Sequence, residues 1–520
     1  MLKNNKQYEY YNHTKINNLK EMFDINLERN PNDIAYSFRE NNNIVTKTFK
    51  DVYKDTIYLS NYFYSKYNNK HIGIISENSY NYIITVLGII LSGNIAVLID
   101  KDLEEEKIKE LIKKSDVKSV YYSSYIKFKV SKGNELEDIK NYIQLGKTKK
   151  NKYKIDDNKE AVIFFTSGTE GPNKAVMLSQ KNIASNLYGA SSLFKPNGGV
   201  VSILPFHHAF GFVTSILKPF YYGTEVFITS SLKKYLKDIQ MVKPDTLFVV
   251  PLFIQTFYKQ IWKEARKNKK DKKQKLTIKL SNRLLKLGID KRRKLFKEIH
   301  NMFGGNLNYI ICGGAYLDEK YIKWFRSIGI EILNGYGITE CSPVVSVNRN
   351  LFNKEGSVGL PCRETKVKII DDEICVKGDN VMLGYYKDKK ATAKVIKDGY
   401  YHTGDLGYID EDGFIFIKGR IKDIIILSNG ENISPEEIES DLYKDEAVNE
   451  VIVYEENNNL VASIYPEEEY MGDQEYFDNL IYEYNKDKPK NHQISYVKLR
   501  SEEFIKNNNK KILRNKVKER

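Results

Sequence analysis

Short apolar runs rich in β-branched residues alternate with helix-sized segments along most of this chain, and this alternation constrains its fold more than any other feature. The runs are HIGIIS at 71–76, AVLID at 96–100, AVIFFT at 161–166, VSILP at 201–205, EVFIT at 225–229, TLFVVP at 246–251 and NYIICGG at 308–314. Buried strands separated by helices pack as largely parallel sheets with helices on their faces. The pattern therefore predicts an α/β fold made of layered α/β subdomains.

The sequence pattern changes after residue 365, where VKIIDDEICVKG and YIDEDGFIFIKGR form short alternating strands with tight turns. A helix is predicted to begin at SPEEIESDLY, with Ser434 as N-cap and Pro435 at the first helical position. A chain of 520 residues also exceeds one compact core. We expect a large N-terminal domain over 1–421 and a small, mobile α+β domain over 422–520, with a hinge near residue 423.

One apolar stretch, YIITVLGIILSGNIAVLI at 82–99, is nearly long enough to span a bilayer. Ser92, Gly93 and Asn94 form a turn signal inside it, so a buried helix followed by a buried strand fits better. The N-terminal MLKNNKQYEYYNH lacks the apolar core of a signal peptide. These features predict a cytoplasmic protein.

The four cysteines, Cys312, Cys341, Cys362 and Cys375, are far apart in the sequence. They lack the close-paired spacing of a zinc site and do not indicate a disulfide framework. A reducing compartment is therefore expected.

The net charge of +14 is concentrated in one segment. Residues 261–300 carry sixteen Lys and Arg against four acids, so the rest of the chain is close to neutral. A local surplus without a recognition motif argues against a nucleic-acid-binding protein.

A first motif, AVIFFTSGTEGPNKAV at 161–176, opens a buried strand into a loop of small and hydroxylated residues that ends at Lys174. Such a loop can direct backbone N–H groups and hydroxyls at a polyphosphate, and a lysine adds a point charge. The GK[ST] ending of a Walker A loop is missing. Taken alone, the segment could equally be an ordinary turn.

A second motif, ILNGYGITECSPV at 332–344, places Tyr336 between two glycines. Thr339 supplies a hydroxyl, and Glu340 supplies a hard oxygen ligand suited to Mg²⁺. The alternative interpretation is a glycine-rich corner with an exposed acid.

A third motif covers residues 399–439 and contains Asp405, which lies between glycines and is placed to accept hydrogen bonds from a sugar diol. Arg420, Lys422 and Asp423 follow at the expected domain boundary. By itself this segment is better interpreted as two β-turns and a salt-bridged linker.

In this order and spacing the motifs resemble those of the adenylate-forming (AMP-binding) superfamily of acyl-CoA synthetases, peptide-synthetase adenylation domains and luciferases. TSGTEGPNK resembles its phosphate loop, LPFHHAFG at 204–211 its acyl-side motif, GYGITE its adenine and Mg²⁺ motif, and YHTGDLGYIDEDGFIFIKGRIKD its ribose and hinge motif. The resemblance runs from about residue 20 to the C-terminus. TLFVVPLFIQTFYKQIWKEARKNKK and ILSNGENISPEEIE are most similar to long-chain fatty acid:CoA ligases.

The resemblance assigns roles residue by residue. It implies phosphate binding by Thr166, Ser167, Gly168, Thr169 and Lys174, adenine binding by Gly314, Ala315, Tyr336 and Gly337, α-phosphate contact by Thr339, Mg²⁺ binding by Glu340, ribose binding by Asp405 and Arg420, a hinge at Asp423, and His208 beside the carboxylate. His207 is interpreted as a packing residue.

The resemblance also implies a catalytic lysine near the C-terminus, in FIKNNNKKILRNKV. The family's Gly-Lys pair falls on Lys510 and Lys511, with Arg514 following, so Lys511 is the predicted catalytic residue. Because the glycine is missing, the register remains open between Lys510 and Lys511. A mobile cation there would neutralise charge that develops at the α-phosphate.

The implied reaction uses ATP and Mg²⁺ to convert a carboxylic acid into acyl-AMP, followed by transfer to coenzyme A. The Asp typical of amino-acid activators is absent near LPFHHAFG, which favours an apolar acid, in particular a medium- or long-chain fatty acid. The alternatives are a fatty acyl–acyl-carrier-protein ligase, an adenylating enzyme for an aryl or short acid, and a binding protein without turnover. The basic segment 261–300 is interpreted as a peripheral contact with the inner membrane face, as a surface for an acidic carrier protein, or as an ordinary solvated helix.

Overall fold

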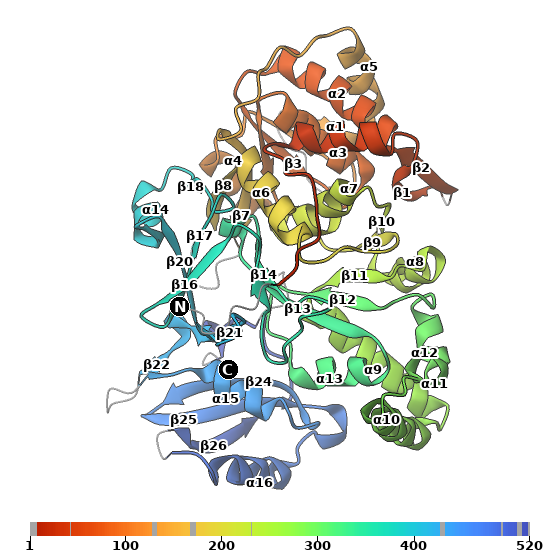
Figure 1. The fold of residues 1–520 in the computed structure, drawn as a ribbon. Coiled ribbons are helices and arrows are strands. Elements are labelled where there is room, and N and C mark those ends of the chain that lie inside the picture. The colour runs from red at the N-terminus through yellow and green to blue at the C-terminus, as the bar shows by residue number, and fades with distance from the viewer. Residues whose placement is uncertain are drawn as a thin grey trace.

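A computed structural model describes residues 8–41, 43–126, 133–166, 173–229, 231–426, 432–489, 492–506 and 512–517. In Figure 1 the N-terminal helices lie at the top, a second α/β layer lies at the right, a smaller sheet lies at the left, and the C-terminal elements lie at the bottom. The predicted α/β fold with a small C-terminal α+β unit is confirmed. The division at residues 421 and 422 stays a prediction.

The first large sheet has the strand order β18-β8-β7-β4-β3-β5-β6 in the described residues. Its strands are β3 (His71–Ile75), β4 (Ile95–Leu98), β5 (Ser119–Tyr122), β6 (Gly133–Glu135), β7 (Glu160–Thr166), β8 (Lys174–Ser179) and β18 (Gly384–Tyr385). The helices that precede, connect or follow these strands are α1 (Leu19–Arg29), α2 (Phe49–Lys66), α3 (Tyr80–Leu91), α4 (Glu105–Lys114), α5 (Ile139–Lys147) and α6 (Gln180–Ser191), with a 3₁₀ turn η1 (Leu136–Asp138). The apolar run at 82–99 forms α3 and β4, as predicted.

The second large sheet has the order β15-β14-β13-β12-β11-β9-β10-β1-β2 within the described ranges. Its strands are β1 (Ile34–Glu40), β2 (Asn43–Thr48), β9 (Val200–Ser202), β10 (Val226–Ile228), β11 (Thr246–Val249), β12 (Tyr309–Cys312), β13 (Glu331–Gly337), β14 (Val344–Val347) and β15 (Leu360–Pro361). The helical elements between these strands are the π-helical η2 (Phe210–Leu217), α7 (Lys218–Tyr222), η3 (Leu232–Lys234), α8 (Tyr235–Val242), α9 (Pro251–Lys267), α10 (Asp271–Lys286), α11 (Arg292–Leu295), α12 (Lys297–Met302), α13 (Glu319–Ser327) and η4 (Thr339–Cys341).

A third sheet lies beside the first two, and its described strands pair antiparallel. Its members are β16 (Lys366–Ile370), β17 (Glu373–Lys377), β19 (Ile396–Lys397), β20 (Tyr400–Ile409) and β21 (Ile415–Arg420), with α14 (Lys389–Val395) before β19 and the turn η5 (Ile421–Asp423) after β21. This sheet carries the third sequence motif.

The C-terminal elements form a separate small core. They are β22 (Ile425–Ile426), β23 (Asn432–Ile433), α15 (Pro435–Leu442), β24 (Val448–Glu456), β25 (Asn459–Pro466), η6 (Glu468–Tyr470), α16 (Gln474–Asn485), β26 (Ile494–Leu499) and η8 (Arg514–Lys516). The predicted helix start at Ser434 and Pro435 is confirmed, although the Ser434 hydroxyl donates to the carbonyl of Lys418 instead of capping the helix.

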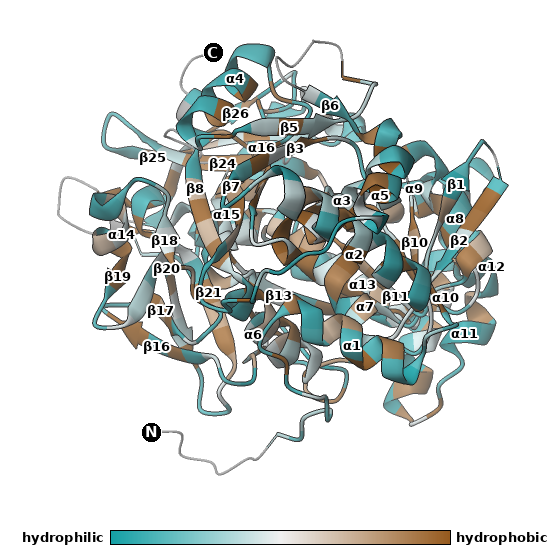
Figure 2. Cartoon of the chain, turned by 90° about the horizontal axis from the view of Figure 1, so that it is seen from above, coloured by the Kyte–Doolittle hydropathy of each residue, from teal (hydrophilic) through white to brown (hydrophobic). Residues whose placement is uncertain are grey.

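In Figure 2 many residues of the central strands are coloured as hydrophobic, whereas the outer helices contain many residues coloured as hydrophilic. None of the helices in the described residues is both long and apolar enough to cross a membrane.

Candidate functional site

A cavity of about 1240 Å³ lies where the two large sheets and the third sheet meet. Its lining contains residues from the motifs at 161–176, 332–344 and 399–439 and from LPFHHAFG, together with Gly314 and Ala315: Thr166, Lys174, His208, Gly314, Ala315, Gly337, Thr339, Glu340, Asp405 and Arg420. Residues separated by up to about half of the chain are thus brought to one place.

The loop of the first motif begins and ends at neighbouring positions, because β7 and β8 are antiparallel and Thr166 pairs with Lys174. The Lys174 ammonium lies 4.7 Å from the centre of the Tyr385 ring. Ser167, Gly168 and Thr169 lie outside the described residues, so their predicted phosphate contacts stay predictions.

Glu340 lies on η4, directly after β13, and is only 8% exposed. The Tyr385 hydroxyl donates a hydrogen bond of 2.9 Å to its Oε1 and lies 3.4 Å from the hydroxyl of Tyr401. Burial and the Glu340 charge raise the pKa of Tyr385, so this hydroxyl stays a donor. Sequence reasoning missed Tyr385, because nothing local links it to an acid 45 positions away.

Asp405 lies on β20 opposite Arg420 on β21, and it is 5% exposed. Its carboxylate accepts a hydrogen bond of 2.5 Å from the Tyr336 hydroxyl and forms an ion pair of 3.2 Å with Arg420 Nε. Burial and Asp405 raise the pKa of Tyr336. Tyr336 itself is 8% exposed and lies behind the residues that line the cavity, so its predicted adenine contact stays a prediction.

The cavity wall includes the glycines Gly314 and Gly337. A Cβ on Gly337 would lie 2.5 Å from the carbonyl oxygen of Pro343, which excludes larger residues there. Gly314 has a φ of +89° and is followed by Ala315, and both are exposed after β12. A flat ligand can therefore approach the main chain closely at this wall.

His208 lies in the segment before η2 and lines the cavity. Its Nε2 lies 3.1 Å from Nε2 of His207, which in turn lies 3.6 Å from Asp100 Oδ1. Burial and the neighbouring His208 lower the pKa of His207 to about 3, so it is neutral. The sequence-based interpretation of His207 as a packing residue missed these polar contacts, because Asp100 is remote in the sequence.

Lys510 and Lys511 lie outside the described residues, and the catalytic role of Lys511 stays a prediction. Arg514, a few positions later, donates to both carboxylate oxygens of Glu439 at 2.7 and 2.5 Å. Its Nε lies 3.9 Å from Asp423, the predicted hinge residue. These contacts tie the C-terminal segment to the start of the small unit.

Comparison with known proteins gives a family and a set of curated relatives. Residues 23–386 match the family described as AMP-binding enzyme. The chain is 31% identical over 382 residues to the chloroplastic long-chain-fatty-acid–[acyl-carrier-protein] ligase AEE15 of Arabidopsis thaliana, covering 61% of this chain and 52% of that protein. It is 32% identical over 308 residues to the long-chain-fatty-acid–CoA ligase of Salmonella typhimurium, covering 56% and 49%. The chain thus spans about half the length of the curated relatives it matches.

Solved structures show the same fold over nearly the whole chain. The o-succinylbenzoate CoA synthetase of Bacillus subtilis, in complex with its acyl-adenylate intermediate, aligns with a TM-score of 0.75 at 20% identity and covers 97% of this chain and 99% of that one. The same synthetase with ATP and a magnesium ion aligns with a TM-score of 0.74 at 21% identity, covering 96% and 99%.

Proposed function

This chain belongs to the AMP-binding enzyme family, and from that premise we propose that it activates a carboxylic acid with ATP as an acyl-adenylate and passes the acyl group to coenzyme A. One observation carries this proposal. The phosphate-side Lys174, the buried Glu340 and the Asp405–Arg420 pair face one cavity, although they come from three sheets or their edges. A nucleotide needs a cation for its phosphates, a metal ligand and an acceptor for its ribose hydroxyls, and this cavity offers all three.

In the first step a carboxylate oxygen attacks the α-phosphorus, a P–O bond to pyrophosphate breaks, and acyl-AMP forms. Orientation and charge neutralisation supply most of the rate in such a transfer. Lys174, Thr339 and His208 all line the cavity. In this proposal Lys174 would hold the departing phosphates, and His208 would lie beside the acyl carboxylate.

The residues present fit Mg²⁺, since Glu340 offers a buried hard oxygen at the cavity wall. When bound there, the ion would supply positive charge for the phosphates. In the second step the thiol sulfur attacks the acyl carbon and the bond to AMP breaks. The predicted hinge at Asp423 would let one small domain serve both steps in turn.

An apolar acid, in particular a medium- or long-chain fatty acid, fits the cavity wall on the His208 side. The apolar residues there are Ile203, Leu204, Val250, Leu252 and Phe253. Burying a methylene group against such a wall stabilises binding by about 0.8 kcal/mol. Relatives whose names specify coenzyme A or an acyl carrier protein as acceptor are equally similar, so a carrier-protein ligase is the alternative.

The basic segment adds a proposed contact with an anionic membrane surface. On α10, Leu276 is 66% exposed and Leu280, one turn later, is 49% exposed, while Leu287 continues the same face at 74%. Exposed basic residues surround this leucine stripe: Lys272, Lys273, Lys275, Lys279, Arg283 and Lys286. The helix lies at a corner of the molecule, at the lower right of Figure 1. An apolar stripe flanked by lysines is typical of helices that lie in a lipid headgroup layer.

Co-sedimentation with phosphatidylcholine vesicles, with and without phosphatidylserine, tests the membrane contact. We expect binding that needs the anionic lipid and that falls in the double variant Leu276→Ser, Leu280→Ser. The matched control is Leu145→Ser, an exposed leucine on α5 that should bind like the parent. Unchanged binding of the double variant would refute the contact.

A pyrophosphate-release screen tests the proposed reaction. The full chain is incubated with ATP and Mg²⁺, with fatty, aryl or amino acids, and with coenzyme A or acyl carrier protein as acceptor. We expect release that depends on a fatty acid, and a thioester with coenzyme A. If none of the acids in the screen caused pyrophosphate release, the proposal would be contradicted. Release with aryl acids alone would show that the substrate is an aryl acid and not a fatty acid.

A further inference from the structure

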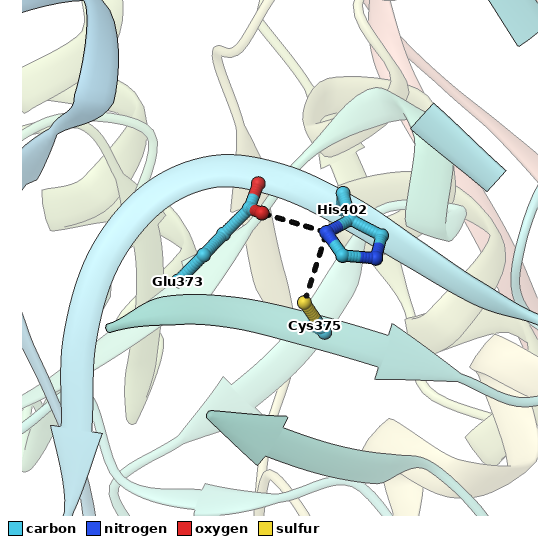
Figure 3. A group of neighbouring side chains, drawn as sticks. All are labelled: Glu373, Cys375 and His402. Carbon is cyan, nitrogen blue, oxygen red and sulfur yellow. Dashed lines mark hydrogen bonds and ion pairs between the residues drawn. The ribbon is translucent and has the colours of Figure 1, made fainter. Parts of the chain in front are cut away.

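A second group of ligand-type side chains lies on the third sheet: Glu373, Cys375 and His402 (Figure 3). Glu373 and Cys375 are two positions apart on β17, and side chains at this spacing project from the same face of a strand. His402 on β20 is the cross-strand partner of Cys375. The sheet register therefore places a carboxylate, a thiol and an imidazole on one face.

The three donor atoms converge on one point. His402 Nδ1 lies 2.6 Å from Glu373 Oε2 and 3.4 Å from Cys375 Sγ, and all three ligand atoms lie within 4.8 Å of one another. A tetrahedral zinc ion with Zn–N of about 2.0 Å and Zn–S of about 2.3 Å places these N and S atoms about 3.5 Å apart. The observed separation of nitrogen and sulfur matches that geometry. Two ligand atoms about 2.0 Å from a tetrahedral ion lie about 3.3 Å apart, so Glu373 Oε2, now 2.6 Å from Nδ1, would have to move away by about 0.7 Å.

The surroundings orient the carboxylate, while Cys375 is fully buried. Glu373 Oε1 accepts a hydrogen bond of 2.7 Å from the backbone N–H of Gly404, so Oε2 is turned toward His402. Glu373 and His402 also line the large cavity, which gives a cation and a completing water molecule a route in.

We propose that Glu373, Cys375 and His402 form a binding site for one divalent cation of borderline softness, of the zinc class. Thiolate, imidazole and carboxylate together select such an ion over Mg²⁺, which prefers oxygen ligands only. Binding replaces the thiol proton and moves the imidazole proton from Nδ1 to Nε2, so one proton is released for each ion bound. Glu373 also accepts the hydrogen bond from the Gly404 N–H, and Gly404 directly precedes Asp405. An ion bound to Glu373 would therefore also hold this segment in place.

Zinc titration of the full chain tests this site without nucleotide or acid, so its outcome is independent of the proposed reaction. Zn²⁺ is added to metal-free protein in competition with a chromophoric chelator, and Co²⁺ is used in parallel to detect thiolate-to-metal charge-transfer absorption. We expect one equivalent of Zn²⁺ and a thiolate band with Co²⁺. In Cys375→Val, which introduces an apolar residue suited to a buried strand position, affinity should fall at least ~10-fold and the band should vanish.

The matched control is Cys312→Val, which removes another buried strand cysteine, on β12 in a different sheet from the cluster. It should bind Zn²⁺ like the parent chain. Far-UV circular dichroism shows whether each variant is folded, and Glu373→Gln is the second ligand variant if Cys375→Val does not fold. Zinc binding of equal affinity in folded Cys375→Val or Glu373→Gln, or no stoichiometric binding by the parent, would overturn the proposal and leave the cluster as a hydrogen-bonded brace.

Discussion

The two buried carboxylates of the cavity, Glu340 and Asp405, have similar hydrogen-bond donors but differ in whether a basic side chain lies beside them. Each accepts a hydrogen bond from a buried tyrosine hydroxyl, Tyr385 for Glu340 and Tyr336 for Asp405. Asp405 also has the Arg420 guanidinium at 3.2 Å. Within the part of the chain that the structure describes, no lysine or arginine forms an ion pair with Glu340.

The difference indicates separate tasks. A buried charge is costly unless a partner compensates it. Asp405 is compensated by the protein itself and is therefore ready to accept hydrogen bonds from neutral hydroxyls. Glu340 has no such partner among the described residues, and we propose that a bound Mg²⁺ ion would supply the compensating charge.

The largest expected effect comes from removing the predicted catalytic cation, Lys511, while Glu340 and Asp405 stay in place. Both carboxylates would remain intact in Lys511→Ala, yet acyl-AMP formation should fall by about 10³-fold or more, because no carboxylate can neutralise charge at the α-phosphate. Thioester formation from supplied acyl-AMP should be spared. The two half-reactions are measured separately, with Lys510→Ala as the control for the register; equal loss of both half-reactions would contradict the assignment.

Glu340→Gln should impair the proposed binding of Mg²⁺. The amide keeps an acceptor for Tyr385 but loses the charge, so adenylation should fall by about 10²–10³-fold and need more Mg²⁺. Pyrophosphate release is measured across a Mg²⁺ titration. A normal Mg²⁺ dependence in this variant would show that Glu340 is not the metal ligand.

Asp405→Asn should affect the sugar side instead. Loss of the charge weakens hydrogen bonds from the ribose and leaves Arg420 uncompensated, so the KM for ATP should rise by about 10–100-fold. The Mg²⁺ dependence should stay that of the parent chain. A shift in Mg²⁺ dependence as large as that of Glu340→Gln would show that Asp405 also takes part in Mg²⁺ binding.

The smallest effects come from the tyrosines and sharpen the comparison most. Tyr385→Phe and Tyr336→Phe each remove one hydroxyl donor to a carboxylate, a loss of about 1.5 kcal/mol, or ~10-fold. We expect Tyr385→Phe to shift the Mg²⁺ dependence and Tyr336→Phe to raise the KM for ATP. The two variants control for each other, and the same change in both would show that the tyrosines serve only stability.

Much of the fold could be predicted because strands and helices leave a local signature. The run at 82–99 predicted α3 and β4, and SPEEIESDLY predicted α15 with Ser434 at its start. The same locality explains why Thr339 and Glu340 could be singled out, since both follow one strand in one motif.

The chain by itself determined which chemical groups follow which strands, because that order is covalent. Only the tertiary structure decided which distant groups meet. The Glu340–Tyr385 contact spans 45 positions, and the four cysteines gave no zinc signal by spacing, yet β17 and β20 place Cys375 beside His402. Cross-strand register and sheet packing set these encounters, and both depend on burial across the whole molecule and not on neighbouring residues.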